Sequence, residues 1–215
     1  MSTPEAKSRS NGGPVGYTRK RARTRRALIN AGRAELAKHG PDGATIGEIA
    51  RRAHVSAGTF YNHFDDLDTL VHTVVDELAR GIEATRERQA ALETDPGAQL
   101  AIGTLQFLRL THDDPAAARA FVALMANVPE FRARVRATVG TAIAEGVDQR
   151  RFVRRQPLVT TDALLGAVVQ WMQTRLVGDA DGTSDADHVT FALHIAGLAY
   201  GEIAGVVDRA IEKAA

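Results

Sequence analysis

The stretch from Thr45 to Leu70, TIGEIARRAHVSAGTFYNHFDDLDTL, constrains the fold of this chain more than any other part of it. Its apolar residues recur at helical spacing, and a short segment around His54 interrupts them. The pattern predicts a helix, a tight turn, a second short helix and the start of a third. Two short helices held at a fixed angle by a small apolar seam can place one helix in a groove of DNA.

Flanking residues predict where the first two of these helices begin and end. A helix over about residues 21–39 precedes the stretch, and the sequence Gly-Pro-Asp-Gly at 40–43 ends it. Thr45 and Glu48 have the spacing of a capping box, in which each side chain satisfies a free backbone amide of the second helix. Ser56 is a favourable N-cap for the third helix.

The third helix, expected over residues 57–64, has an outward face without acidic side chains. Phe60 and Phe64 lie four residues apart and should face the core, which leaves Gly58 and Asn62 nearly opposite. The amide of Asn62 can pair with adenine, while hydroxyl and imidazole groups beside it can donate to phosphate oxygens. These neighbours are Thr59, Tyr61 and His63. For Tyr61 or His63 alone, a partly packed surface position is the alternative.

Charge is divided unevenly along the chain. Residues 1–64 contain 12 Lys and Arg against 4 Asp and Glu, whereas residues 65–215 contain 15 against 22, so the net charges are +8 and −7. Residues 1–18 are expected to be a flexible tail. Six basic residues then fall within positions 19–26, among them Arg21, Arg23 and Arg25. We expect this segment to contact DNA as a basic arm, although a solvated charge run is the alternative.

Residues from about 21 to 78 resemble the TetR family of bacterial transcriptional regulators. The matching pattern is a basic first helix followed by Thr45-Ile46, Glu48-Ile49-Ala50, Val55-Ser56, Gly58-Thr59, Phe60-Tyr61, His63-Phe64 and Leu70. The resemblance implies a homodimer that binds a palindromic operator in double-stranded DNA, most often as a repressor, and that a small molecule bound in the C-terminal domain releases. It also implies base contacts from Ser56, Ala57, Gly58, Tyr61 and Asn62, and backbone contacts from Thr45, Thr59, Tyr61 and His63.

Three residues depart from the family pattern. His54 stands where the family usually has Gly, so the turn is expected to be strained or to use His54 as an extra donor. Ala57 stands where a polar or basic side chain is frequent. Leu67 replaces a Lys that commonly points at phosphate, and three aspartates surround it, Asp65, Asp66 and Asp68. The basic arm is therefore expected to make an unusually large share of the phosphate contacts.

The whole chain is predicted to be all-α, with about nine helices in two domains. A helix-turn-helix DNA-binding domain is expected over residues 19–66, and a helical effector-binding and dimerisation domain over residues 67–215. The last of the nine helices is expected to run from about 185 to 212. Candidate pocket residues are Gln106, Arg109, Gln170, Trp171, Met172 and His194, for which a place in the core or on the solvated surface is the alternative.

Small residues mark the last two predicted helices. Gly197, Gly201 and Gly205 lie at spacing four, and Gly166 lies on the preceding helix. Glycine within a helix costs about 1 kcal/mol against alanine, so another helix is expected to approach closely there. The resemblance identifies these helices with the dimer interface of the family, and packing within one subunit is the alternative.

Composition and motifs argue against other classes of protein. The chain has no cysteine, and therefore no disulfide or thiolate metal site. No stretch approaches the roughly 18 apolar residues of a membrane span, and we expect a soluble cytoplasmic protein without membrane contact. The seven histidines form no metal-binding motif, and neither a phosphate loop nor a nucleophile elbow is present. An enzyme, a metal site and a cofactor are therefore not expected. We expect a regulator with a small hydrophobic effector, and the alternative is a constitutive or architectural DNA-binding protein that has no effector.

Overall fold

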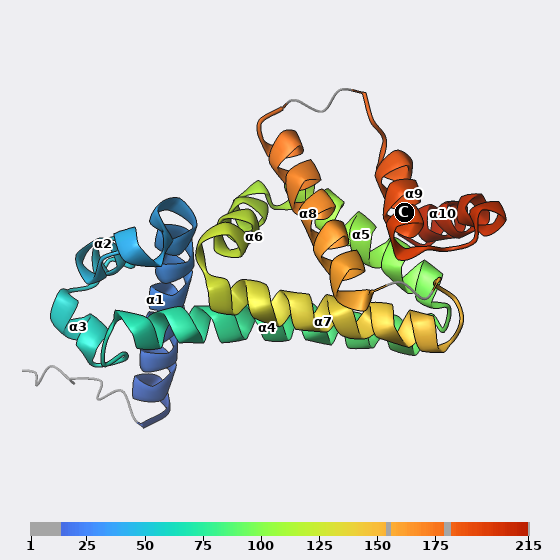
Figure 1. The fold of residues 1–215 in the computed structure, drawn as a ribbon. Helices are drawn as coiled ribbons and strands as arrows, with labels where there is room; N and C mark the ends of the chain where they lie inside the picture. The colour runs from blue at the N-terminus through green and yellow to red at the C-terminus, as the bar shows by residue number, and fades with distance from the viewer. Residues whose placement is uncertain (1–13, 154–155, 179–181, 215) are drawn as a thin grey trace, which may run out of the picture.

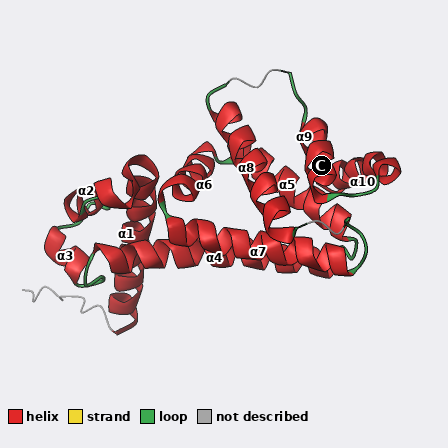
Figure 2. Cartoon of the chain, viewed as in Figure 1, coloured by secondary structure: helices red, strands yellow, loops and turns green. Residues whose placement is uncertain are grey.

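The computed structural model describes residues 14–153, 156–178 and 182–214, which form ten α-helices and, within those ranges, no strand (Figure 2). The helices are α1 (Pro14–Gly43), α2 (Ile46–Arg52), α3 (Ala57–Tyr61), α4 (Leu67–Leu92), α5 (Pro96–Asp113), α6 (Pro115–Asn127), α7 (Pro129–Asp148), α8 (Pro157–Leu176), α9 (Asp185–Ala196) and α10 (Tyr200–Ala214). Helices α1 to α3 gather at one end of the long helix α4, α5 and α7 pack against the rest of α4, and α6, α8, α9 and α10 pack against α5 (Figure 1). The predicted all-α fold with an N-terminal helix-turn-helix is confirmed.

Helix α1 is longer than the sequence predicted. It begins at Pro14 instead of about residue 21, so the basic run at 19–26 lies on a helix and is not a flexible arm. The part of the expected tail over residues 1–13 lies outside the described residues. Gly40 interrupts the helix with φ of 68°, a left-handed conformation that glycine adopts at little cost. A rigid helix fixes the direction of each basic side chain, which a tail does not.

Helices α1 and α4 touch closely near the helix-turn-helix. A Cβ atom added to Gly32 of α1 would lie 2.8 Å from a methyl carbon of Leu70 on α4, and Leu70 is fully buried. Asp66 begins α4 by accepting hydrogen bonds from the backbone N–H of Thr69 at 2.7 Å and its hydroxyl at 2.6 Å. Leu67 packs against the core, so the first turn of α4 is held by an apolar contact and a cap.

The predicted last helix is in fact two helices. Helix α9 ends at Gly197, which has φ of 83°, and α10 begins at Tyr200. A Cβ atom at Gly197 would lie 3.2 Å from the backbone nitrogen of Val153, whose N–H donates to the Gly197 carbonyl at 3.0 Å. The prediction of one helix over 185–212 was wrong because the small size of Gly197 serves a turn and a contact within the protomer.

Candidate DNA-binding face and effector cavity

The turn between α2 and α3 has a defined helix-ending motif. The N–H of Val55 donates to the carbonyl of Ala50 at 2.9 Å, and the N–H of His54 donates to that of Arg51 at 3.1 Å. Together these bonds form a Schellman motif, in which the residue after the cap is left-handed. His54 is that residue, with φ of 56°. The turn therefore has the conformation that glycine provides most cheaply.

Helix α3 presents small and polar groups to solvent, as predicted. Phe60 is fully buried and Phe64 is 2% exposed, whereas Tyr61 is 56% exposed. Ala57, Gly58 and Asn62 are exposed as well. The helix ends at Tyr61 instead of residue 64, but backbone bonds from His63 and Phe64 to the Phe60 carbonyl, at 2.8 and 3.0 Å, continue it as a turn.

Two hydroxyl groups at the start of α3 bond to each other. Ser56 Oγ accepts from the backbone N–H of Thr59 at 3.1 Å and lies 2.9 Å from Thr59 Oγ1. The N-cap role predicted for Ser56 is thus confirmed. Two lone pairs and one hydroxyl proton of the two hydroxyl groups are already used within the protein, which leaves two lone pairs and one proton for a ligand.

The basic side of α1 lies beside the end of α3. The guanidinium carbon of Arg25 is 4.6 Å from the ring centroid of Phe64. Burial, followed by the positive charges of Arg21 and Arg25, lowers the pKa of His63. These side chains therefore belong to one positively charged surface that α1 and α3 share. Arg23 is exposed on the same helix, whereas Arg26 turns to Glu77 of α4 at 3.6 Å.

Helix α2 is held by contacts that differ from the predicted capping box. Thr45 Oγ1 accepts from the backbone N–H of Glu48 at 3.3 Å, as expected. The Glu48 carboxylate, however, accepts from Nε and Nη2 of Arg51 at 2.9 and 2.7 Å, and this contact also lowers its pKa. The reciprocal half of the predicted box was wrong because the charged guanidinium is a stronger donor within reach than a backbone amide.

An ion pair that the sequence analysis missed joins α2 to α1. Glu35 is 2% exposed, and its carboxylate accepts from Arg52 Nε at 2.9 Å. His39 lies 3.7 Å from the same carboxylate. The signal was present, because Glu35 follows Leu28 by seven residues and so falls on the apolar face of α1. A carboxylate on that face requires a cation from a neighbouring element.

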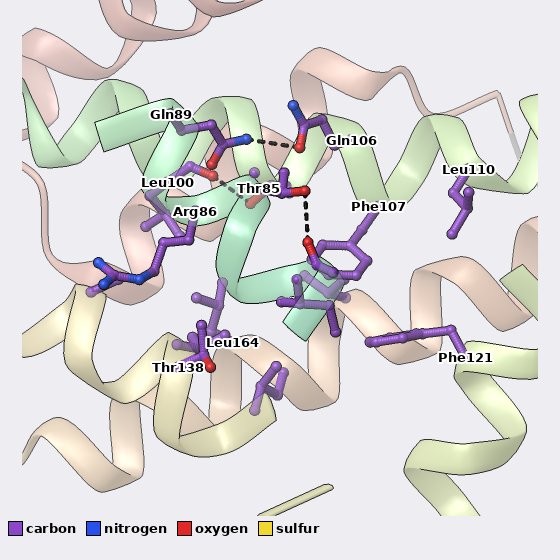
Figure 3. Close-up of a pocket in the computed structure, with 18 of the residues that line it drawn as sticks. Thr85, Arg86, Gln89, Leu100, Gln106, Phe107, Leu110, Phe121, Thr138 and Leu164 are labelled. Atoms are coloured by element: carbon purple, nitrogen blue, oxygen red, sulfur yellow. Dashed lines mark hydrogen bonds between the residues drawn. The ribbon is translucent and has the colours of Figure 1, made fainter. Parts of the chain in front are cut away.

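A cavity of about 430 Å³ lies between the helices that follow the helix-turn-helix. Its wall comes from α4 to α8 with contributions from Arg33 of α1 and from Phe152 (Figure 3). Four of the seven phenylalanines of the chain line it: Phe107, Phe121, Phe131 and Phe152. The ring centroids of Phe107 and Phe121 are 4.9 Å apart, and those of Phe121 and Phe131 are 5.7 Å apart. The cavity is therefore mainly apolar and partly aromatic.

Polar side chains gather where α4 meets α5. Gln89 Nε2 donates to Gln106 Oε1 at 2.8 Å, and Thr85 lies one turn before Gln89 (Figure 3). Arg86 also lines the cavity, but its guanidinium binds Glu83 at 3.1 Å and Glu145 at 3.2 Å. The wall thus offers amide and hydroxyl groups at one seam, beside an arginine whose charge two carboxylates offset.

Of the six predicted pocket residues, only Gln106 lines this cavity. The other five lie elsewhere: α8 lines the cavity through residues 164–169 and not through 170–172, no residue of α9 lines it, and Arg109 of α5 is not among the lining residues. Arg109 approaches Asp185 at 3.9 Å, Trp171 packs edge-on to His188, Met172 is buried, Gln170 is exposed, and His194 is exposed beside Tyr200. Sequence periodicity separates buried from exposed positions, but it does not tell a cavity wall from a filled core.

The glycines predicted for an interface differ in their surroundings. Gly166 on α8 and Gly201 on α10 are exposed, and a Cβ atom added to either meets nothing within 4 Å. A Cβ atom at Gly205 would lie 3.4 Å from the Arg209 guanidinium. Helices α8, α9 and α10 carry four large apolar side chains that are 57–83% exposed: Leu158, Val159, Phe191 and Tyr200. Packing within the protomer therefore does not explain Gly166 or Gly201.

Two further observations on the described residues concern membrane crossing and metal binding. None of their helices has the length and apolar character that a membrane crossing requires. No group of three or more histidine or acidic side chains among them is placed to hold a metal ion.

A capped helix-turn-helix beside a basic helix defines the class of protein: a DNA-binding regulator with a helical second domain. Residues 28–74 match the family described as bacterial regulatory proteins, tetR family. The match covers the helix-turn-helix part of the chain, which is therefore a TetR-type DNA-binding domain.

Solved structures share the fold across both domains. RolR in complex with resorcinol is 23% identical with a TM-score of 0.57, over 89% of this chain and 96% of that one. An ArpA-like gamma-butyrolactone receptor is 20% identical with a TM-score of 0.69, over 89% and 97%. The regulator FadR from Bacillus subtilis in complex with stearoyl-CoA is 16% identical with a TM-score of 0.61, over 80% and 95%. At these identities the likeness establishes the fold, and the ligands are those of the other proteins.

Proposed function

We propose that this protein is a ligand-responsive repressor that binds a palindromic operator as a homodimer and leaves it when a small molecule fills the cavity. One observation carries the proposal. Helix α4 begins in the DNA-binding domain, where Leu70 packs against α1, and its later residues from Glu77 to Gln89 form a wall of the cavity. A single rigid element therefore belongs to both sites.

The coupling follows from differential binding. A ligand shifts an equilibrium only if it binds one position of α4 better than another. The close contact between Gly32 and Leu70 leaves no room for α4 to slide without α1. A displaced α4 would therefore tilt the whole DNA-binding unit formed by α1 to α3. In a homodimer such a tilt changes the distance between the two DNA-binding units, whereas the half-sites on DNA have a fixed spacing. We expect this mismatch to weaken binding.

The residues proposed to read the operator are those on the shared face of α1 and α3. Asn62, Tyr61 and Gly58 are exposed at its centre and are proposed to face bases, together with Ser56 and Ala57. Thr45, Thr59 and His63, with Arg21, Arg23 and Arg25 of α1, are proposed to contact the backbone. Both groups are needed, because phosphate contacts orient a protein and base contacts select the sequence.

The test begins with selection of bound sequences from a random pool of duplex DNA by the full chain. We expect a two-fold symmetric site and two chains per duplex, measured by fluorescence anisotropy and by the mass of the complex. The Asn62→Ala variant should lose about 1–3 kcal/mol of discrimination at one base pair of each half-site. Enrichment of asymmetric or unrelated sequences would refute the proposal.

A constitutive DNA-binding protein without an effector is the second candidate. It would bind the selected operator equally well in the presence and absence of compounds that occupy the cavity. The cavity and its shared helix favour a regulated protein instead. A screen of small molecules against the preformed complex, read by loss of anisotropy, distinguishes the two.

A further inference from the structure

We propose that the cavity selects an uncharged, mostly apolar molecule whose one oxygen-bearing polar group binds the amides of Gln89 and Gln106. The inference rests on the proposed function, since it specifies the chemistry of the effector. It is carried by the arrangement of polar and charged side chains in the wall. Three features of that wall are decisive: its apolar area, the free capacity of the amide pair, and the carboxylates that neutralise Arg86.

The interior favours a compact apolar body. The cavity volume of about 430 Å³ lies in the lower half of the range of about 300–1,000 Å³ for small-molecule sites. Four phenylalanines and aliphatic residues such as Ile82, Leu100 and Leu164 provide the wall. Each Å² of apolar ligand surface buried there contributes about 25 cal/mol. A molecule with several polar groups would leave most of them without partners.

The amide pair can still bind one polar group after its own hydrogen bond is made. Gln89 uses one N–H on Gln106 Oε1, which leaves Gln106 Nε2 as a donor and Gln89 Oε1 as an acceptor. A carbonyl oxygen can accept from the first, and a hydroxyl can donate to the second. Gly103 lies beside the amide pair, since a Cβ atom added there would make an ordinary contact with Gln89 Oε1 at 3.7 Å.

The charges of the wall disfavour an anion. Arg86 and Arg33 are the lining cations among the described residues. Glu83 and Glu145 already occupy the guanidinium of Arg86, and Glu77, which pairs with Arg26 at 3.6 Å, adds another carboxylate to the wall. A carboxylate would have to give up water and also displace or face these acidic groups, which costs several kcal/mol in an apolar site. A large thioester of coenzyme A adds phosphates to the same difficulty.

The experiment uses the full chain without DNA and a matched pair of ligands. N-phenyl-1-naphthylamine, an uncharged fluorescent compound, serves as the reporter of the cavity. It is displaced by γ-decalactone or by decanoate at pH 8, where the acid is ionised. We expect the lactone to bind at least about tenfold more tightly than decanoate.

Variants locate the binding and identify the polar contact. Gly81 lines the cavity and an added Cβ atom meets nothing within 4 Å, so Gly81→Phe should remove reporter binding without a clash. Gln106→Leu should weaken the lactone about 3–10-fold and leave the reporter unchanged, because only the lactone uses the amide. Gln170→Leu is the control, since Gln170 is exposed on α8 outside the cavity.

The outcomes separate this inference from the proposed function. Tighter binding of decanoate than of lactone, or equal lactone affinity in Gln106→Leu, would overturn the inference. Failure of the reporter and both ligands to bind would overturn it too. If decanoate alone binds and releases the operator, the effector function stands without this chemistry. If the lactone binds as expected but the operator is retained, the chemistry stands and the effector function fails.

Discussion

At the scale of single residues, His54 shows the cost of the tight turn. A non-glycine residue with φ near 56° is strained by about 1–2 kcal/mol, although histidine tolerates this region better than branched residues. We expect His54→Gly to raise the free energy of unfolding by about 0.5–1 kcal/mol, since part of the relief is lost to the greater entropy of unfolded glycine. The measurement is the midpoint of urea unfolding at constant slope.

The neighbouring Ala53 provides the control for this prediction. It has φ of −77°, so Ala53→Gly gains nothing from left-handed freedom and should lower stability. A destabilised His54→Gly variant would mean that the imidazole makes a contact worth more than the strain.

His63 should make DNA binding depend on pH. Its pKa in the free protein is below the ordinary value of 6.5, because of burial and then of Arg21 and Arg25. Phosphate beside the ring would favour the imidazolium, so the complex should take up a proton. Operator affinity is therefore expected to rise as pH falls below the pKa that His63 has in the complex. It should level off once the pH is below the pKa that His63 has in the free protein. The total rise is up to about tenfold for each unit by which the two pKa values differ.

Anisotropy titrations between pH 8 and 5.5 at constant ionic strength test this. His63→Gln should bind with little dependence on pH, and His112→Gln, an exposed histidine on α5, should behave as the parent chain does. Equal pH profiles for the parent and His63→Gln would exclude a phosphate contact from His63.

Local residue patterns predicted the helix-turn-helix of α2 and α3 well, and the contacts that support it less well. The caps at Thr45 and Ser56 and the burial of Phe60 and Phe64 follow from interactions within four residues, which a sequence displays. The partner of Glu35 is 17 residues away, and Gly197 is explained by Val153 on another segment. Such contacts depend on how helices pack, and sequence periodicity contains no information on that.

At the scale of elements, α1 is both a support and a charged surface. Its buried side contacts α4 and α6, while Arg21, Arg23 and Arg25 lie on the part that precedes the buried core of the helix. A charged side chain on a helix is held in direction at lower entropic cost than one on a tail. The helical form of this segment therefore favours defined phosphate contacts.

Neutralising these three arginines should flatten the salt dependence of operator binding. Each phosphate contact contributes about 0.9 to the slope of log K against log salt, so Arg→Gln at all three positions should reduce the slope by about 1–3. Anisotropy titrations from low to moderate salt measure it. Arg119→Gln removes an exposed charge from α6 as a control, and an unchanged slope in the triple variant would refute the prediction.

At the scale of the whole molecule, the sequence indicated two domains but not the cavity between helices α4 to α8. Five helices from residues 67–176 contribute to the cavity, and each contributes side chains that look like ordinary core positions in its own periodicity. An empty space arises when such faces fail to close on each other. Among the predicted pocket residues, Gln106 lies in the cavity wall and Arg109 of the same helix does not, so a polar residue in the apolar helix α5 was an ambiguous signal.

Dimerisation through α8 and α10 is the prediction that belongs to this scale. Gly201 is exposed with no atom within 4 Å of an added Cβ, so Gly201→Leu cannot clash within the protomer and should gain about 0.5–1 kcal/mol of helix propensity. A partner helix packed on Gly201 would be displaced by the same side chain. We therefore expect the variant to be monomeric by sedimentation at concentrations where the parent chain is dimeric, with unfolding stability of the protomer unimpaired.

Gly47→Leu is the matched control, because Gly47 of α2 is equally open but lies on the DNA-binding domain, and it should stay dimeric. A dimeric Gly201→Leu variant would place the interface elsewhere, and a monomeric parent chain would contradict the proposed homodimer itself.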